Sequence, residues 1–367
     1  MRIAYILLWN VQSGDGIAQK VRTQADMWIK LGHEAKLFCN VLGELPSSKS
    51  GWLDSEECFR YDNWLQYLFD SNQEVLKRIE EYTPDIVYLR FETFQPYHRK
   101  LNQRFPVVME LNADDVQEYQ VNAKQKFTSK LMYLYHRLTR KLLFGPVKGI
   151  VSVTHEIANL PNVKYYNKPY IVLPNTLNLE NYEAIPYEED REMPNLVFMG
   201  SNGVFWHGIS KIIELAKNTV GELNFHLIGN IKNDESTSSP NITYHGYLSK
   251  REFEELFSKI DVGIGSLSFH EKNMYEACSL KTREYLSRGL PIILGYNDTA
   301  FLNRELPQWV LQLPNAPDNV ELNIAQIIEF ARQMKGRRLT KDEVAPYIDS
   351  LPFEKKRLAF FQSILSK

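Results

Sequence analysis

Short apolar runs alternate with amphipathic segments along the first half of the chain. Apolar runs of strand length lie at 3–8, 35–38, 86–89, 106–111, 150–153 and 170–173. Helical periodicity marks segments at 17–31, 64–82, 116–121 and 124–144, and a polar, turn-rich excursion lies at 43–60. Strands that alternate with helices predict a parallel sheet with both faces covered.

The same pattern starts again after an acidic, proline-containing stretch at 180–194, which is typical of a linker. Further strands are predicted at 196–199, 225–228, 242–245, 262–264, 290–294 and 309–313. Further helices are predicted at 209–217 and 250–260, and an amphipathic helix at 353–366. The pattern therefore predicts an α/β protein of two domains, with boundaries at 1–173 and 174–353.

Glu276 and Glu284 have seven residues between them and precede the predicted strand 290–294. Gly289 after Arg288 suits a helix that ends with glycine at C′ and a cation in its last turn. The carboxyl edge of an open α/β sheet is where such sheets bind ligands. If all eight steps were helical, the two Cα atoms would be about 12 Å apart along the helix axis, which suits two hydroxyl-rich groups joined by a spacer. The alternative is two solvated glutamates on a helix that caps a strand.

The composition indicates a globular protein and disfavours nucleic-acid binding and a zinc site. The 367 residues are 44% hydrophobic and 24% charged, which suits two globular domains. A net charge of −2 gives no global field for nucleic acid. Three widely spaced cysteines favour a reducing compartment without a zinc site. With an N-terminal apolar run too short for a signal peptide and no long apolar segment, we expect a cytoplasmic protein.

The stretch EACSLKTREYLSRGLPII, residues 276–293, resembles the E-x7-E signature of retaining GT-B glycosyltransferases, in particular glycosyltransferase family 4 (group 1). The resemblance implies that Glu284 holds the ribose hydroxyls of a nucleotide sugar. It also implies that Glu276 lies by the transferred sugar and contributes to catalysis. The glycine-rich phrase usual beside the first glutamate is absent here, so Glu271 is the alternative to Glu276.

The family resemblance also implies an architecture of two Rossmann-like domains that face a cleft. Residues 1–173 would form the acceptor-side domain, and residues 174–353 would bind the nucleotide sugar. The last helix, at 354–367, would return to pack on the first domain.

The turn MGSNGVFWHGISK, at 199–211, is a candidate site for the donor diphosphate. Gly200 and Ser201 follow a strand, and the backbone N–H groups of the next helix would favour an anion. The alternative is an ordinary strand-to-helix turn. Family members place an arginine and a lysine here, whereas this chain has neither between residues 191 and 211. His207 has the approximate place of the lysine, and Lys281 or Arg283 could supply the missing charge.

Two further sequence features are candidates for donor contacts. Gly14 and Gly16 follow the first strand and resemble the N-terminal glycine loop of the family, which approaches the donor phosphates. Gln19 stands where a dinucleotide-binding fingerprint has its third glycine, so an NAD site is poorly supported. Tyr247, at the end of a predicted strand, lies where the family packs the nucleotide base.

Polar residues at two strand ends are candidates for the acceptor side. Asn112, Asp114 and Asp115 follow the strand at 106–111, although either aspartate could instead cap a helix. Arg90 and Glu92 end the preceding strand. No D-x-D triplet occurs, so we expect neither a metal nor a cofactor, and only a nucleotide-sugar co-substrate.

A basic region with interleaved aromatic residues spans 124–148, and residues 119–155 contain no Asp or Glu. Such a helix can lie on an anionic membrane surface. The alternative is a solvated basic face with the aromatic side chains in the core.

The family resemblance implies metal-independent transfer of a sugar from a nucleotide diphosphate to a hydroxyl, with retention of configuration. The acceptor would be a bacterial surface glycan, free or lipid-linked, at the inner face of the plasma membrane. One alternative is a GT-B enzyme such as a nucleotide-sugar epimerase, for which only the acidic residues at 110–118 offer proton-transfer groups. The other is a non-catalytic scaffold, which the missing Arg/Lys clamp would favour.

Overall fold

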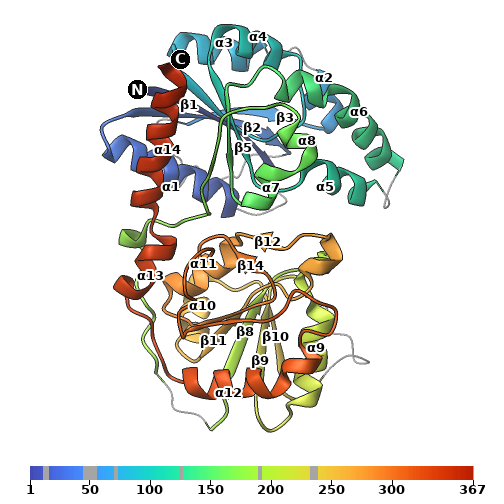
Figure 1. The fold of residues 1–367 in the computed structure, drawn as a ribbon, viewed down its shortest axis with the longest axis vertical. Coiled ribbons are helices and arrows are strands. Elements are labelled where there is room, and N and C mark those ends of the chain that lie inside the picture. The colour runs from blue at the N-terminus through green and yellow to red at the C-terminus, as the bar shows by residue number, and fades with distance from the viewer. Residues whose placement is uncertain are drawn as a thin grey trace. The chain divides into compact units, whose positions relative to one another are not determined.

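The computed structural model describes residues 1–10, 16–43, 56–69, 73–123, 127–188, 192–231 and 239–366. The chain divides into two compact units (Figure 1). The first unit is Met1–Pro174 together with Ser350–Lys367, and the second is Asn175–Asp349. The boundaries drawn from the sequence lie at 173/174 and 353/354.

A seven-stranded parallel sheet forms the centre of the first unit, in the order β3-β2-β1-β4-β5-β6-β7. Its strands are β1 (Arg2–Asn10), β2 (Glu34–Leu42), β3 (Glu56–Tyr61), β4 (Ile86–Arg90), β5 (Val107–Leu111), β6 (Gly149–Ser152) and β7 (Tyr170–Val172). The strand order reverses between β1 and β4, which is the topology of a Rossmann-like sheet.

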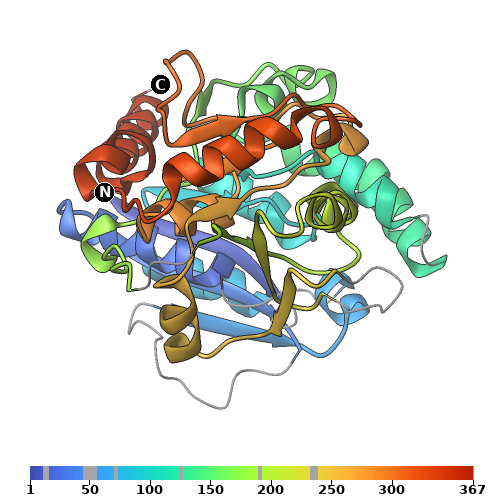
Figure 2. The ribbon, with the colours of Figure 1, turned by 90° about the horizontal axis from the view of Figure 1, so that it is seen from below.

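Helices accompany this sheet, as its parallel strands require crossover connections. They are α1 (Gly16–Lys30), α2 (Trp64–Phe69), α3 (Gln73–Tyr82), α4 (Tyr97–Arg104), α5 (Asp115–Asn122), α6 (Phe127–Phe144), α7 (His155–Asn159), α8 (Pro161–Lys164) and α14 (Ser350–Leu365). The C-terminal helix α14 packs on α1, and Phe361 contacts Trp28 and Tyr88 in the core. Helix α6 lies at the outer edge of this unit in both views (Figures 1 and 2).

The second unit repeats the topology with six parallel strands in the order β10-β9-β8-β11-β13-β15. They are β8 (Asn195–Met199), β9 (Asn224–Ile228), β10 (Ile242–Gly246), β11 (Val262–Ile264), β13 (Ile292–Leu294) and β15 (Val310–Gln312). A separate parallel pair joins β12 (Glu276–Ala277) to β14 (Asn297–Asp298). The helices are α9 (Ile209–Asn218), α10 (Lys250–Phe257), α11 (Leu280–Ser287), α12 (Ile324–Met334) and α13 (Lys341–Ile348).

The structure differs from the sequence pattern where apolar periodicity was weak. Strand β3 begins inside the predicted excursion at 43–60 and ends one residue beyond it, and it was not predicted because its mostly half-buried residues alternate little in polarity. The predicted helix at 64–82 corresponds to α2 and α3, and residues 70–72 lie outside the described ranges. Helix α4 was missed because its sequence, YHRKLNQR, is mostly polar.

Within the described ranges, every helix falls short of the combination of length and apolar character that a membrane span needs.

Candidate active site

The switch point of the second sheet lies between β8 and β11, where ligands bind in open α/β folds. Gly200 follows β8, and the loop after β11 is joined to the loop after β8 by backbone hydrogen bonds. The Leu267 amide donates to the His207 carbonyl at 3.1 Å, and the Ser268 amide donates to the Trp206 carbonyl at 3.2 Å. The two loops therefore form one connected rim at this edge of the sheet.

Neighbouring atoms fill the space that a side chain at position 200 would occupy. A Cβ atom there would lie 2.5 Å from the Phe198 ring and 2.9 Å from Nδ1 of His207. A Cβ on Gly229 would lie 2.1 Å from the Gly200 carbonyl oxygen. Contacts this short require displacement of backbone or packed rings, so both positions need glycine.

Helix α9 begins at this rim. Its N-cap residue is Gly208, whose φ of +73° is left-handed and which offers no side-chain cap. The first amide groups of a helix lack intrahelical partners and carry partial positive charge, so they favour an anion. The hydroxyl of Ser268 lies beside this start, 2.9 Å from where a Cβ on Gly208 would stand, and is buried without a hydrogen-bond partner.

Lys281 of α11 brings a cation to the same place. Its stem is half-buried, but its Nζ is shielded from solvent, has no hydrogen-bond partner and lies 4.2 Å from the centre of the Phe198 ring. Burial lowers the pKa of Lys281 to about 7. A buried, unpaired ammonium is costly to a fold, and such groups cluster at functional sites.

His207 is not a second cation. Burial, and then the charge of Lys281, lower the pKa of His207 to about 3. Its ring lies 5.5 Å from that of Phe198, and Nδ1 is buried without a partner. The imidazole is therefore neutral at physiological pH and can only donate or accept a hydrogen bond.

Arg283, the other candidate for the missing charge, is fully engaged. Its guanidinium donates to both carboxylate oxygens of Asp298 at 2.6 and 2.8 Å and to the Asn175 carbonyl at 2.8 Å. Asp298 belongs to β14, whose partner strand β12 carries Glu276. Arg283 thus fixes helix α11 to the strand pair that holds the first glutamate of the motif, which leaves Lys281 as the available cation.

Glu284 lies three residues after Lys281, on the same face of α11. Its carboxylate accepts a hydrogen bond from Nε of Arg288 at 2.9 Å, and its side chain is 26% exposed. Arg288 in turn lies 5.1 Å from the centre of the Tyr182 ring. This pair was not among the contacts predicted from the sequence, although a glutamate four residues before an arginine on a helix is its signal. Gly289, with φ +82°, ends the helix as predicted.

Glu276 lies on a strand rather than on α11, so the helical distance of about 12 Å does not describe the pair. It is half-buried, in register with Asn297 of β14. The alternative, Glu271, lies exposed on the short 3-10 helix Phe269–Lys272.

Tyr247, just after β10, is 83% exposed, which leaves its ring free to stack.

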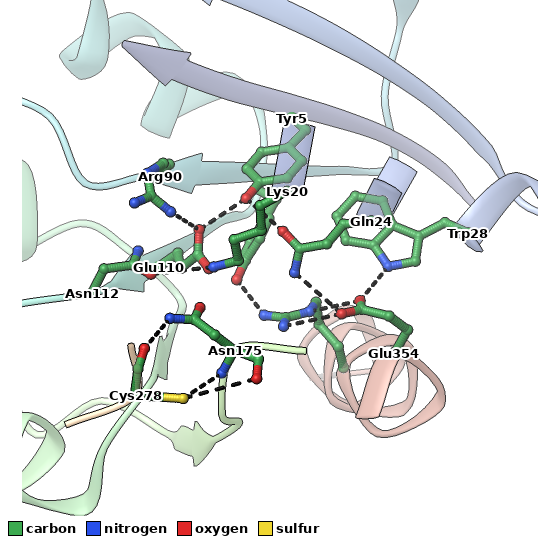
Figure 3. A network of polar contacts seen from close by, with 12 residues as sticks. Tyr5, Lys20, Gln24, Trp28, Arg90, Glu110, Asn112, Asn175, Cys278 and Glu354 are labelled. Carbon is green, nitrogen blue, oxygen red and sulfur yellow. Dashed lines mark hydrogen bonds and ion pairs between the residues drawn. The ribbon is translucent and has the colours of Figure 1, made fainter. Parts of the chain in front are cut away.

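Two of the acceptor-side candidates meet in a buried network of the first unit. Glu110 of β5 accepts hydrogen bonds from Lys20 and Tyr5, each at 2.8 Å, and from Arg90 at 3.2 Å (Figure 3). Burial alone raises the pKa of Glu110, but Lys20 and the nearby arginines hold it well below its usual range. Lys20 also donates to Asn112 at 3.2 Å.

The remaining acceptor-side carboxylates have partners within the unit. Asp114 caps α5 by accepting from the Gln117 amide at 3.1 Å. Asp115 is buried and binds His136 at 2.7 Å and Arg140 at 2.6 Å, which joins α5 to α6. The helix-cap alternative therefore describes Asp114.

Glu92 is also buried, where it accepts hydrogen bonds from Tyr67, Tyr97 and His98 at 2.8 to 2.9 Å. Of the acidic residues at 110–118 that an epimerase would need, Glu110, Asp114 and Asp115 are engaged in contacts within the unit.

Three of the residues named from the sequence, Gly14, Lys124 and Lys126, lie outside the described ranges. Gly16 is the first residue of α1. Within the described ranges, the structure contains no group of three or more His, Cys, Asp or Glu side chains arranged to hold a metal ion.

Comparison with known proteins identifies the fold. No family model matches the sequence, and no curated protein matches it. Solved structures match it over nearly its full length at low sequence identity. The chain has the GT-B fold.

Three similar structures illustrate the match. Sucrose-phosphate synthase from Thermosynechococcus elongatus is 14% identical over 100% of this chain and 99% of that chain, with a TM-score of 0.67. An α-glucosyltransferase in complex with UDP-glucose and DNA containing an abasic site is 13% identical over 100% of both chains, also with a TM-score of 0.67. The lipopolysaccharide outer core galactosyltransferase WaaB is 13% identical over 99% of this chain and 100% of that chain, with a TM-score of 0.61.

Proposed function

We propose that this chain is a retaining, metal-independent glycosyltransferase that moves a sugar from a nucleotide diphosphate to a hydroxyl group. The observation that carries the proposal is the ammonium group of Lys281, buried without a partner beside the Gly200 turn and the start of α9. A diphosphate supplies the negative charge that this ammonium lacks. The similar structures support the proposal because they include glycosyltransferases with the same fold.

Six candidate residues of the second unit have roles in this proposal. The diphosphate binds the backbone of Gly200 and Ser201, the first turn of α9 and Lys281, with neutral His207 as a hydrogen-bond partner. Glu284 binds the ribose hydroxyls, and Glu276 binds the sugar. Lys281 and Glu284 share one face of α11, so a single helix would contact the diphosphate and the ribose together.

The chemistry follows from these positions. The bond between the anomeric carbon and the diphosphate oxygen breaks, and the acceptor oxygen bonds to the same face of that carbon. The departing diphosphate takes the acceptor proton, as the family resemblance implies. Negative charge grows on the diphosphate during this step, and a cation in a water-poor site stabilises such charge strongly. Lys281 would therefore act in the transition state as well as in donor binding.

We further propose that the acceptor is a glycan or lipid-linked glycan of the bacterial surface, reached at the cytoplasmic face of the plasma membrane. Support comes from WaaB, described as a lipopolysaccharide galactosyltransferase. We expect no nucleic-acid acceptor, because the net charge is −2. The α-glucosyltransferase structure contains DNA, so DNA belongs among the acceptors tested.

Calorimetric titration with UDP-, GDP-, ADP- and CMP-sugars, each in EDTA and in Mg²⁺, tests the donor site. We expect one diphosphate sugar to bind without metal. CMP-sugars serve as a control, because they lack a diphosphate. Lys281→Met and Glu284→Ala should each weaken binding at least about tenfold, as expected for the loss of a charged hydrogen bond. Lys217→Met, at an exposed position on α9, should bind as the wild type.

Two results would contradict the proposal. One is that none of the nucleotide sugars binds, with or without acceptor glycans present. The other is that Lys281→Met binds the donor as tightly as the wild type. If binding occurs, nucleoside diphosphate release should be lost in Glu276→Ala while donor affinity persists, and NMR of the product should show the donor's anomeric configuration.

A further inference from the structure

Helix α6 exposes a row of large apolar side chains. The row consists of Phe127, Leu131, Leu134, Leu138 and Leu142. Steps of three and four residues place them on one face of the helix. Leu131 is 53%, Leu134 is 54% and Leu138 is 65% exposed. The opposite face is fixed to the unit, because His136 and Arg140 bind Asp115. Packing against the rest of the unit therefore does not account for this row of apolar side chains, which is called the leucine row below.

Helix α2 extends this apolar surface. Its Leu65 is 70% exposed and its Phe69 is 64% exposed. The ring of Phe69 lies 6.0 Å from that of Tyr135 on α6, so the two helices are neighbours. A groove of about 730 Å³ lies between them, lined mainly by Trp64, Leu65, Phe69, Leu131, Met132 and Tyr135. Exposed apolar surface of this kind marks an interaction site.

Cations border the leucine row on one side. Lys130, Arg137 and Lys141 are exposed, and at 100° per residue they fall beside the row, away from the buried face. No Asp or Glu occurs between residues 119 and 155, although the whole chain is slightly acidic. This local charge is complementary to an anionic surface. A second copy of the chain would bring the same cations, and like charges would then oppose one another.

We propose that α2 and α6 dock the first unit on an anionic lipid bilayer. The leucine row enters the boundary of the acyl chains, the three cations meet lipid phosphates, and the groove takes one hydrocarbon chain. An apolar row with a basic border is what an interfacial helix requires. The proposal goes beyond glycosyl transfer and does not rest on it, because neither helix carries a donor-site residue.

Flotation with vesicles tests the electrostatic part of the proposal. We expect binding to vesicles of equal parts phosphatidylglycerol and phosphatidylcholine, and much weaker binding to phosphatidylcholine alone. Changing Lys130, Arg137 and Lys141 to Gln should weaken binding to the anionic vesicles about a hundredfold, at roughly fivefold for each cation. The matched control changes three exposed lysines of the second unit, Lys217, Lys250 and Lys341, to Gln and should bind as the wild type.

The apolar part is tested by Leu131→Glu with Leu138→Glu, which should abolish binding to both kinds of vesicle. Because both side chains are exposed, circular dichroism and thermal unfolding should match the wild type. Leu322→Glu is the control, since Leu322 is 72% exposed in the second unit.

Bromolipid quenching locates the groove relative to the bilayer. Trp64 is 39% exposed at the groove, whereas Trp9, Trp28 and Trp309 are buried. Bromine on the acyl chains should quench part of the tryptophan fluorescence, and Trp64→Phe should remove the part that is quenched.

The proposal is overturned if the protein does not bind the anionic vesicles. It is equally overturned if Leu131→Glu/Leu138→Glu binds like the wild type, or if sedimentation shows a dimer that these changes dissociate.

Discussion

At the scale of single residues, the buried side chain of Lys281 lowers the free energy of unfolding, and a role in ligand binding would explain why the chain keeps it. A lysine in water has a pKa near 10.4, and burial lowers that of Lys281 to about 7. Between these values the unfolded chain holds a proton that the folded chain does not. The contribution of Lys281 to the free energy of unfolding is therefore unfavourable below pH 7 and diminishes as the pH rises toward 10.

This linkage predicts opposite effects of Lys281→Met on stability and on function. The variant should be more stable than the wild type at pH 6 to 7, by a few kcal/mol, and the difference should vanish near pH 10. Urea unfolding at several pH values measures it. A variant less stable than the wild type at pH 7 would show that the ammonium has a structural partner.

The same group predicts how donor affinity depends on pH. A diphosphate binds the protonated form of Lys281, so the Kd should rise roughly tenfold per pH unit above 7, up to the pKa of Lys281 in the complex. In Lys281→Arg the affinity should be independent of pH between 6 and 9, because arginine stays charged. Titration calorimetry across this range measures both proteins. An identical pH profile for the two would assign the dependence to another group.

At the scale of elements, one buried ion pair organises the carboxylate motif. Arg283 of α11 and Asp298 of β14 are both fully buried, and their contact joins the helix of Glu284 to the strand pair of Glu276. Breaking such a pair leaves an uncompensated charge in the interior. The separation of the two glutamates of the motif therefore depends on Arg283 and Asp298, neither of which belongs to the candidate donor site.

Asp298→Asn should destabilise the protein by about 3–5 kcal/mol, because the Arg283 guanidinium loses its counter-ion. The double variant Arg283→Met/Asp298→Leu should lose less than the sum of the single changes. Denaturant unfolding measures these effects, and the surface change Arg251→Met with Glu255→Leu is the matched control. Additive losses in the buried double variant would show that the pair does not act as a unit.

At the scale of the whole molecule, the C-terminal helix completes the unit that begins the chain. Glu354 of α14 accepts hydrogen bonds from Trp28 at 2.7 Å and Gln24 at 3.2 Å (Figure 3). Arg357 donates to Glu354 at 2.8 Å. Arg357 also donates to Tyr88 of β4. These buried contacts join residues more than 300 positions apart.

Glu354→Leu should therefore weaken the first unit selectively, because it leaves Arg357 without its buried counter-ion. Hydrogen exchange should become faster in α1, β1 and β4 and stay unchanged in β8, β11 and β13. The control is Glu343→Leu in the second unit, where the carboxylate is partly exposed. Faster exchange throughout both units would show that the two unfold together.

Several features were predictable because they depend on local pattern. Most strands follow from short apolar runs, and Gly289 ends α11 because few other residues accept its left-handed backbone. The two Rossmann-like halves follow from the repeated alternation of strands and helices. Strand β3 and helix α4 did not follow, since neither has strong apolar periodicity.

The α/β class and the two-unit organisation follow from the linear pattern of apolar and polar residues. That Arg283 is paired with Asp298 while Lys281 lacks a hydrogen-bond partner followed only from the folded structure, since two residues two positions apart on a helix face different surroundings. The folded structure also decided that Asp114 is a cap, and that the leucines of α6 face outward. Periodicity shows that a helix has an apolar face, but contacts between distant segments decide whether that face is covered.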